Sequence, residues 1–276
     1  GLATFFSFNA GAFADEPALS AKLLRTCETF VVEQLDDGKP SGTIDVVTAM
    51  KFFNAERVGS NAPVVNGALL LCIEKGRPIA AINVYPWDGN ICHELDVLTS
   101  RPTFRIQYNA GQIWQPKESN LSFLPVKATS KPNLSHTRRL FQMKQLARRV
   151  TCTLEGFNDD NSDRQPLRLL PNPIYRYATD HGSAVGGTSD GAIFAFAQGN
   201  DPEVLLLIEA TDEPESTAWR YGFVRASSAK LSAAFDDLEV WQAEKFPDDT
   251  KSVGAHYTVR QPFDAIDIPD ASTKGK

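Results

Sequence analysis

The sequence contains one pair of residues that could transfer a proton or bind a ligand, His93-Glu94. It lies within a run of strand-forming residues. Neighbouring residues of a strand point to opposite faces of the sheet, so this pattern does not favour a shared metal ion or proton relay. We keep His93 as a candidate ligand-binding residue. The alternative is a structural histidine held by hydrogen bonds.

A second group consists of arginines, whose guanidinium groups suit anionic ligands. Arg138 and Arg139 begin a predicted helix and are candidate ligand-binding residues, although such a cluster is also typical of a solvated helix face. Arg176 lies between Tyr175 and Tyr177, which share one face of a predicted strand. Arg176 therefore takes the other face, where it is a third candidate or part of an internal ion pair.

Other chemical signatures are missing from the sequence. We find no His-x-x-x-His pair, no Cys/His metal spacing and no phosphate-binding Gly-x-x-x-x-Gly-Lys-Ser/Thr loop. We therefore expect no catalytic residue, no metal ion and no cofactor. The four cysteines form no Cys-x-x-Cys pair, and buried free thiols are favoured over disulfides.

Composition restricts the partners. The 276 residues carry a net charge of −6, which argues against binding to nucleic acid or to an anionic membrane. No apolar run approaches the roughly 18 residues of a membrane helix. The apolar N-terminal segment ends in Ala12-Phe13-Ala14, which is typical of a signal peptide cleaved after Ala14. This pattern predicts a periplasmic or secreted protein; the alternative is an N-terminal segment docked on the core.

The order of predicted elements repeats along the chain. Gly67 and Gly191 lie 124 positions apart, as do Pro78 and Pro202, and Cys27 and Cys152 lie 125 apart. We therefore predict an α+β fold with two tandem copies of one helix packed on an antiparallel sheet of about six strands. The copies span 15–117 and 135–245, with 1–14 as the signal remnant, 118–134 as a connector and 246–276 as a polar tail. A single β-rich domain is the alternative.

Several motifs also occur in a characteristic order. They include Gly76-Arg77-Pro78, His93-Glu94, Arg138 to Met143, Pro173 to Tyr177, and Asp190-Gly191-Ala192 through Asp201-Pro202-Glu203. Over roughly residues 45 to 245 the chain resembles a set of uncharacterised proteins abundant in planctomycete bacteria. The resemblance implies an exported or envelope-associated protein and no assigned activity. The chain departs from the pattern after His93-Glu94, where Val97-Leu98 replaces a common Ser-Leu pair.

Three functions remain open from the sequence. A non-catalytic extracytoplasmic module that binds an unknown protein or small molecule comes first. A small-molecule carrier with a cavity between sheet and helix comes second. The third is a hydrolase-type enzyme with a site between the two copies, to which His93 or an arginine contributes.

Overall fold

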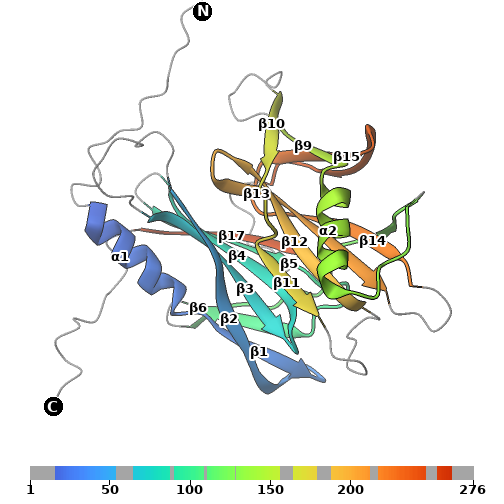
Figure 1. Cartoon of the computed structure of the whole chain (residues 1–276). Coiled ribbons are helices and arrows are strands. Elements are labelled where there is room, and N and C mark those ends of the chain that lie inside the picture. Colours follow the sequence, from blue (N-terminus) through green and yellow to red (C-terminus); the bar gives the residue numbers. More distant parts are fainter. Residues whose placement is uncertain are drawn as a thin grey trace, which may run out of the picture.

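The computed structural model describes residues 16–53, 65–87, 90–108, 111–127, 129–155, 164–178, 188–211, 217–246 and 254–262. Within these ranges the chain forms two helices and seventeen strands (Figure 1). The first sheet has the order β17-β5-β4-β3-β2-β1-β6-β7. Helix α1 (Glu16–Cys27) precedes its strands β1 (Val31–Asp36), β2 (Lys39–Phe53), β3 (Val65–Glu74), β4 (Arg77–Trp87), β5 (Asn90–Val97), β6 (Phe104–Tyr108) and β7 (Gln112–Trp114), and β17 is His256–Pro262.

The second sheet, written from its β8 edge, has the order β8-β14-β13-β12-β10-β9-β15-β16, and β11 also pairs with β12. Its elements are β8 (Leu124–Pro125), α2 (His136–Ala147), β9 (Val150–Glu155), β10 (Arg164–Leu169), β11 (Tyr175–Ala178), β12 (Thr188–Gln198), β13 (Asp201–Thr211), β14 (Trp219–Arg225), β15 (Lys230–Phe235) and β16 (Leu238–Ala243).

The two sheets have one topology and exchange their edge strands. Strand by strand, β1 to β7 of the first sheet correspond to β9, β10 with β11, β12, β13, β14, β15 and β16 of the second. The segment after β7 supplies β8 to the second sheet, and the segment after β16 supplies β17 to the first. This reciprocal exchange supports the internal duplication. It also places part of the expected polar tail, 256–262, in a sheet.

The predicted α+β class, with a helix covering each sheet, is wrong. The protein is mostly β, and each sheet curls until it is nearly closed. The helices have only 12 residues each, and they contact β3 and β4 (α1) or β12 and β13 (α2). Most of each core is therefore covered by the curled sheet itself, and the sheets have eight and nine strands in place of about six.

The sheets differ from the predicted kind because their central strands are apolar on both faces. Along β13, Leu206 faces the core inside the second sheet, whereas Leu205 and Leu207 face a third core between the two sheets. Leu70 and Leu71 of β3 divide in the same way between the first sheet's core and the third core. Strands buried on both faces give continuous apolar runs, which leave no solvated face for a sheet of the predicted kind.

In both halves, an aromatic ring lies over an equivalent glycine on the paired strand. A Cβ atom added at Gly67 would lie 2.0 Å from the Phe52 ring, and one added at Gly191 would lie 2.5 Å from the Tyr177 ring. In each case the ring belongs to the residue directly opposite on the paired strand. The two aromatic rings thus lie flat over glycines 124 positions apart, which explains why this residue type occurs at both positions.

Several local predictions are confirmed. The hairpin around Gly199-Asn200 is formed by β12 and β13. Helix α2 buries Met143, Leu146 and Ala147, as its apolar stripe predicts. All four cysteines are free, and Cys72, Cys92 and Cys152 are buried as predicted, whereas Cys27 is partly exposed. The predicted signal segment, 1–14, lies outside the described residues.

Candidate functional site

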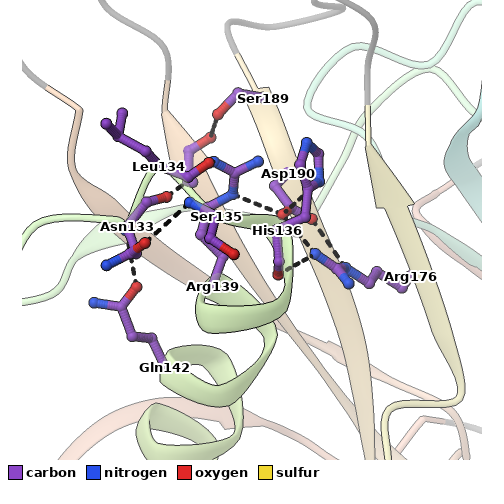
Figure 2. Close-up of polar contacts among 10 residues, drawn as sticks. Asn133, Leu134, Ser135, His136, Arg139, Gln142, Arg176, Ser189 and Asp190 are labelled. Atoms are coloured by element: carbon purple, nitrogen blue, oxygen red, sulfur yellow. Dashed lines mark hydrogen bonds and ion pairs between the residues drawn. The ribbon is translucent and has the colours of Figure 1, made fainter.

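Two of the predicted site residues meet at one buried carboxylate. Arg139 of α2 donates from Nε to Asp190 Oδ2 at 2.7 Å, and Arg176 of β11 donates from Nη2 to the same oxygen at 2.8 Å (Figure 2). Nδ1 of His136 lies 3.4 Å from this oxygen. Asp190 is fully buried. Arg138, one position away, is exposed and is absent from the contacts around Asp190.

This cluster fastens the start of α2 to the sheet. Arg139 also donates to the carbonyl of Asn133, and Arg176 donates to the carbonyl of His136, so much of their donor capacity is already used. The first turn of α2 has no acidic residue of its own. Asp190 supplies the negative charge that a helix N-terminus favours. The internal ion pair is therefore the better interpretation of Arg139 and Arg176.

His93 lies elsewhere, inside the first sheet. It is fully buried, and its ring meets Phe30 edge-to-face at 5.6 Å and lies 6.0 Å from the Tyr108 ring. Neither ring nitrogen has a hydrogen-bond partner among the described residues. Burial lowers the His93 pKa to about 4, so the imidazole is neutral near pH 7. The interpretation as a hydrogen-bonded structural histidine does not hold for this ring.

A groove lies between α1 and the strands β1 and β2, and His93 is not among the residues that line it. It has a volume of about 550 Å³, and Phe30, Val32, Ile44 and Leu70 form part of its apolar floor. Glu28, Asp45 and Lys51 also line it and are exposed. Phe30 thus contacts the groove on one side and His93 on the other.

A network around Glu209 joins the two sheets. The Glu209 carboxylate is fully buried and lies 2.7 Å from both Arg77 of the first sheet and Arg220 of the second. Tyr177 donates its hydroxyl proton to Oε1 at 2.7 Å, and Thr188 donates to Oε2 at 2.9 Å. Both carboxylate oxygens are paired, so the cost of burying the Glu209 charge is offset by its partners. The network also holds the two sheets together, and in this sense it acts as a lock between them.

A second polar cluster crosses the same interface with a different composition. Pairing of β17 with β5 places His256 opposite Asp96 and Thr258 opposite Glu94. His256 Nδ1 lies 2.8 Å from Asp96 Oδ1, and these two side chains are 1% and 2% exposed. Ser228, in the β14–β15 turn, donates its backbone N–H to Glu94 Oε1 at 2.9 Å. Residues from three distant segments thus meet at one point.

Buried acids surround this second cluster. Burial raises the pKa of Glu94, of Asp201 and of Glu203, the last to about 7. Oε2 of Glu94 and Oδ1 of Asp201 have no hydrogen-bond partner among the described residues, nor has Oδ1 of Asn83. These carboxyl groups therefore favour protonation in the folded protein.

Sequence reasoning missed this cluster for a physical reason. Glu94 stood beside His93 in the sequence, but the two side chains point to opposite faces of β5, as strand geometry requires. His256 lies in a segment that the sequence assigns to the polar tail. Its alternating neighbours, Tyr257 and Val259, were the available signal for a strand.

One further motif has the residue spacing that surrounds the catalytic serine of some hydrolases. Residues 187–191 read Gly-Thr-Ser-Asp-Gly, the spacing of a nucleophile elbow. Ser189 lies within β12, however, and donates its hydroxyl to the carbonyl of Ala210 at 3.3 Å. An elbow requires a turn from strand into helix, so this serine is not a nucleophile of that type.

Neither a metal nor a membrane span is indicated in the described part of the chain. No group of three or more His, Cys, Asp or Glu residues there could hold a metal ion. No helix in the same ranges has the length and apolar character needed to cross a membrane. Comparisons with family models, with curated proteins and with solved structures found no match to this chain. The resemblance to planctomycete proteins stays a prediction from motifs.

Proposed function

We propose that the chain binds a small amphipathic molecule, with its apolar part in the groove beneath α1 and its polar head against His93. The groove, at about 550 Å³, falls within the size range of small-molecule sites. Its apolar floor favours a hydrocarbon body. This function corresponds to the carrier hypothesis, and a location outside the cytoplasm stays a prediction from the N-terminal segment.

The observation that carries the proposal is the unsatisfied imidazole of His93. Leaving a buried polar group without a partner costs about 1–3 kcal/mol, and folded proteins keep few such groups. The Tyr108 hydroxyl and the Trp114 indole nitrogen in the same core also lack a hydrogen bond of ordinary geometry among the described residues. Phe30 lines the groove and its ring contacts those of both His93 and Tyr108. The proposal therefore requires the Phe30 side chain to rotate, so that the head of the ligand reaches His93.

The chemistry of His93 restricts the head group. A neutral imidazole offers one N–H donor and one acceptor nitrogen. A carboxylate would lose its hydration here and would gain no ion pair from His93. The expected ligand therefore has a neutral hydrogen-bonding head, such as an alcohol, a ketone or an amide.

A fluorescence titration with the neutral dye N-phenyl-1-naphthylamine tests the groove. Thr48 lines the groove and is exposed, so that Thr48→Trp should fill the space without disturbing the core. Val47 precedes it and points to the opposite face of β2. We expect Thr48→Trp to weaken dye binding at least about tenfold, the effect of losing about 1.4 kcal/mol, and Val47→Trp to leave it unchanged. Equal binding by both variants would refute the groove as the site.

Competition with 1-decanol and with decanoate tests the head group. We expect decanol to displace the dye at lower concentration than decanoate, and His93→Leu to raise the concentration of decanol that is needed, because the alcohol then loses its hydrogen-bond partner. The same substitution should raise the free energy of unfolding by about 1 kcal/mol, because it removes two unsatisfied nitrogens. A His93→Leu variant that binds decanol as tightly as the wild-type protein would contradict the role of His93.

A further inference from the structure

The polar cluster on β5 and β17 has the parts of a nucleophilic site. His256 Nδ1–H donates to Asp96 Oδ1, which leaves Nε2 as the acceptor of the ring. Nε2 lies 3.4 Å from Ser228 Oγ and 3.0 Å from Thr258 Oγ1. A serine next to an imidazole that a buried carboxylate orients is the arrangement that activates a hydroxyl group for attack.

Glu94 holds the serine in place. Its Oε1 accepts both the backbone N–H of Ser228 at 2.9 Å and the Ser228 hydroxyl at 2.5 Å. Thr258 Oγ1 lies 3.0 Å from Ser228 Oγ, so a second route leads from Ser228 to His256 through one hydroxyl group. Thr258 Oγ1 is the hydroxyl closer to Nε2, but it is a branched secondary alcohol within β17. Ser228 has an unbranched primary hydroxyl group in the connection between β14 and β15, and we take it as the nucleophile.

The pseudo-symmetry of the fold supplies an internal comparison. Arg77 opens β4 and Asp201 opens β13, so the two residues occupy equivalent positions. On the Arg77 side, both oxygens of Glu209 are paired and the network acts as a lock. On the Asp201 side, the carboxyl oxygens Glu94 Oε2 and Asp201 Oδ1 stay without a partner among the described residues. A cluster that only held the two sheets together would not require buried carboxyl oxygens without hydrogen-bond partners.

We propose that Ser228, His256 and Asp96 form a catalytic set that transfers acyl groups from small carboxylic esters to water. The Ser228 hydroxyl first rotates, so that its proton turns from Glu94 Oε1 to His256 Nε2, 3.4 Å from Oγ. Ser228 Oγ then bonds to the ester carbonyl carbon while this proton passes to His256 Nε2. The carbon–oxygen bond to the alcohol then breaks, and the alcohol leaves with the proton from His256. Water, deprotonated by His256, attacks the acyl-serine, which releases the carboxylic acid and restores Ser228.

Access to the site defines the substrate size. Ser228 and Thr258 are partly exposed, whereas His256 is buried, and the Phe246 ring lies edge-on against it at 4.5 Å. The backbone N–H of Phe246 donates to the carbonyl of Ser228 at 2.8 Å, which holds this ring over the imidazole. The site therefore suits small esters, and Phe246→Ala should speed the reaction with larger ones.

Labelling of the full chain with an alkyl fluorophosphonate tests the proposal. The expected product is a phosphonyl adduct on Ser228, found by intact mass and by peptide mapping, with release of fluoride. Ser228→Ala should remove the adduct, and Ser189→Ala, which removes the serine of the elbow-like motif, should retain it. The absence of an adduct on Ser228, under conditions that label chymotrypsin fully, would overturn the proposal, as would an adduct on Ser189 alone.

The rate of labelling separates catalysis from simple exposure. His256→Gln should slow labelling about 100-fold, the usual minimum for loss of a general base. Should that variant unfold, the wild-type pH profile decides: the rate should rise with one ionisation and then level off. A rate that rises tenfold per pH unit without levelling off would overturn the role of His256. Dye binding in the groove beneath α1 does not depend on this result.

Discussion

Two buried groups, Glu203 and His93, should give the stability of this protein opposite dependences on pH. Glu203 on β13 is 5% exposed, and burial raises its pKa from 4.5 to about 7. His93 on β5 is fully buried, and burial lowers its pKa from 6.5 to about 4. Both groups therefore favour their neutral forms in the folded protein.

The signs of the two effects follow from proton binding. Between pH 4.5 and 7 the folded state holds a proton on Glu203 that the unfolded state has lost, so this stabilisation is present at low pH and falls as pH rises. Between pH 4 and 6.5 the unfolded state holds a proton on His93 that the folded state lacks, so that stability falls as pH decreases. Each effect amounts to about 1.4 kcal/mol per pH unit, or about 3 kcal/mol in full.

In the wild-type protein these two slopes oppose each other from pH 4.5 to 6.5, and single substitutions should separate them. Glu203→Gln removes the falling term and His93→Leu removes the rising one. The stability of His93→Leu relative to Glu203→Gln should thus decrease by about 2.7 kcal/mol per pH unit, or about 5 kcal/mol over this interval. Titrating groups that interact with neither Glu203 nor His93 cancel in this difference.

The assay is urea denaturation of both variants at half-unit steps from pH 4.5 to 6.5, followed by tryptophan fluorescence and by circular dichroism. Equal slopes against urea across the series would show that the denatured states are comparable. Parallel pH curves for the two variants would refute the reasoning, because they would mean that neither group titrates differently on folding.

Two further predictions concern packing and ion pairing. Asp190→Asn should lower the free energy of unfolding by about 3 kcal/mol, because it removes the buried charge that pairs with Arg139 and Arg176; a loss below 0.5 kcal/mol in urea denaturation would contradict this role. Gly191→Ala should destabilise by about 1–3 kcal/mol through contact with the Tyr177 ring. Gly42→Ala, where a Cβ meets no atom within 4 Å, is its control, and equal midpoints would refute the steric argument.

Sequence patterns were informative where the structure depends on neighbours along the chain. The β12–β13 hairpin and the apolar stripe of α2 follow from turn chemistry and helical period. The fold class was wrong because the run Val204 to Ile208 is apolar at every position, which indicates burial on both faces and therefore a second sheet as a partner. That signal was present and was assigned to ordinary strands under a helix.

The sites were less predictable, because each depends on partners distant in sequence. Arg139 and Arg176 were recognised by residue type, but their shared partner Asp190 lies on a third element. His93 was a candidate for its chemistry alone, and its lack of hydrogen bonds becomes visible only with the whole core in place. His256 belongs to a strand whose partner, β5, precedes it by 160 positions.

The exchange of edge strands explains why the most reactive cluster lies at the interface. The first sheet ends at β5 unless β17 is added, and β17 reaches β5 only after the chain has completed the second sheet. His256 thus arrives on the strand that joins the halves, opposite Asp96, while Ser228 arrives from the second half. The equivalent strand β8 consists of two residues and pairs only through Leu124 and Pro125. One edge of this pseudo-symmetric molecule therefore carries histidine and threonine beside two acids, and the other carries none of them. If the two edge strands served only to hold the halves together, the β17 edge and the β8 edge would not need to differ in this way. This difference is the reason to test Ser228 first.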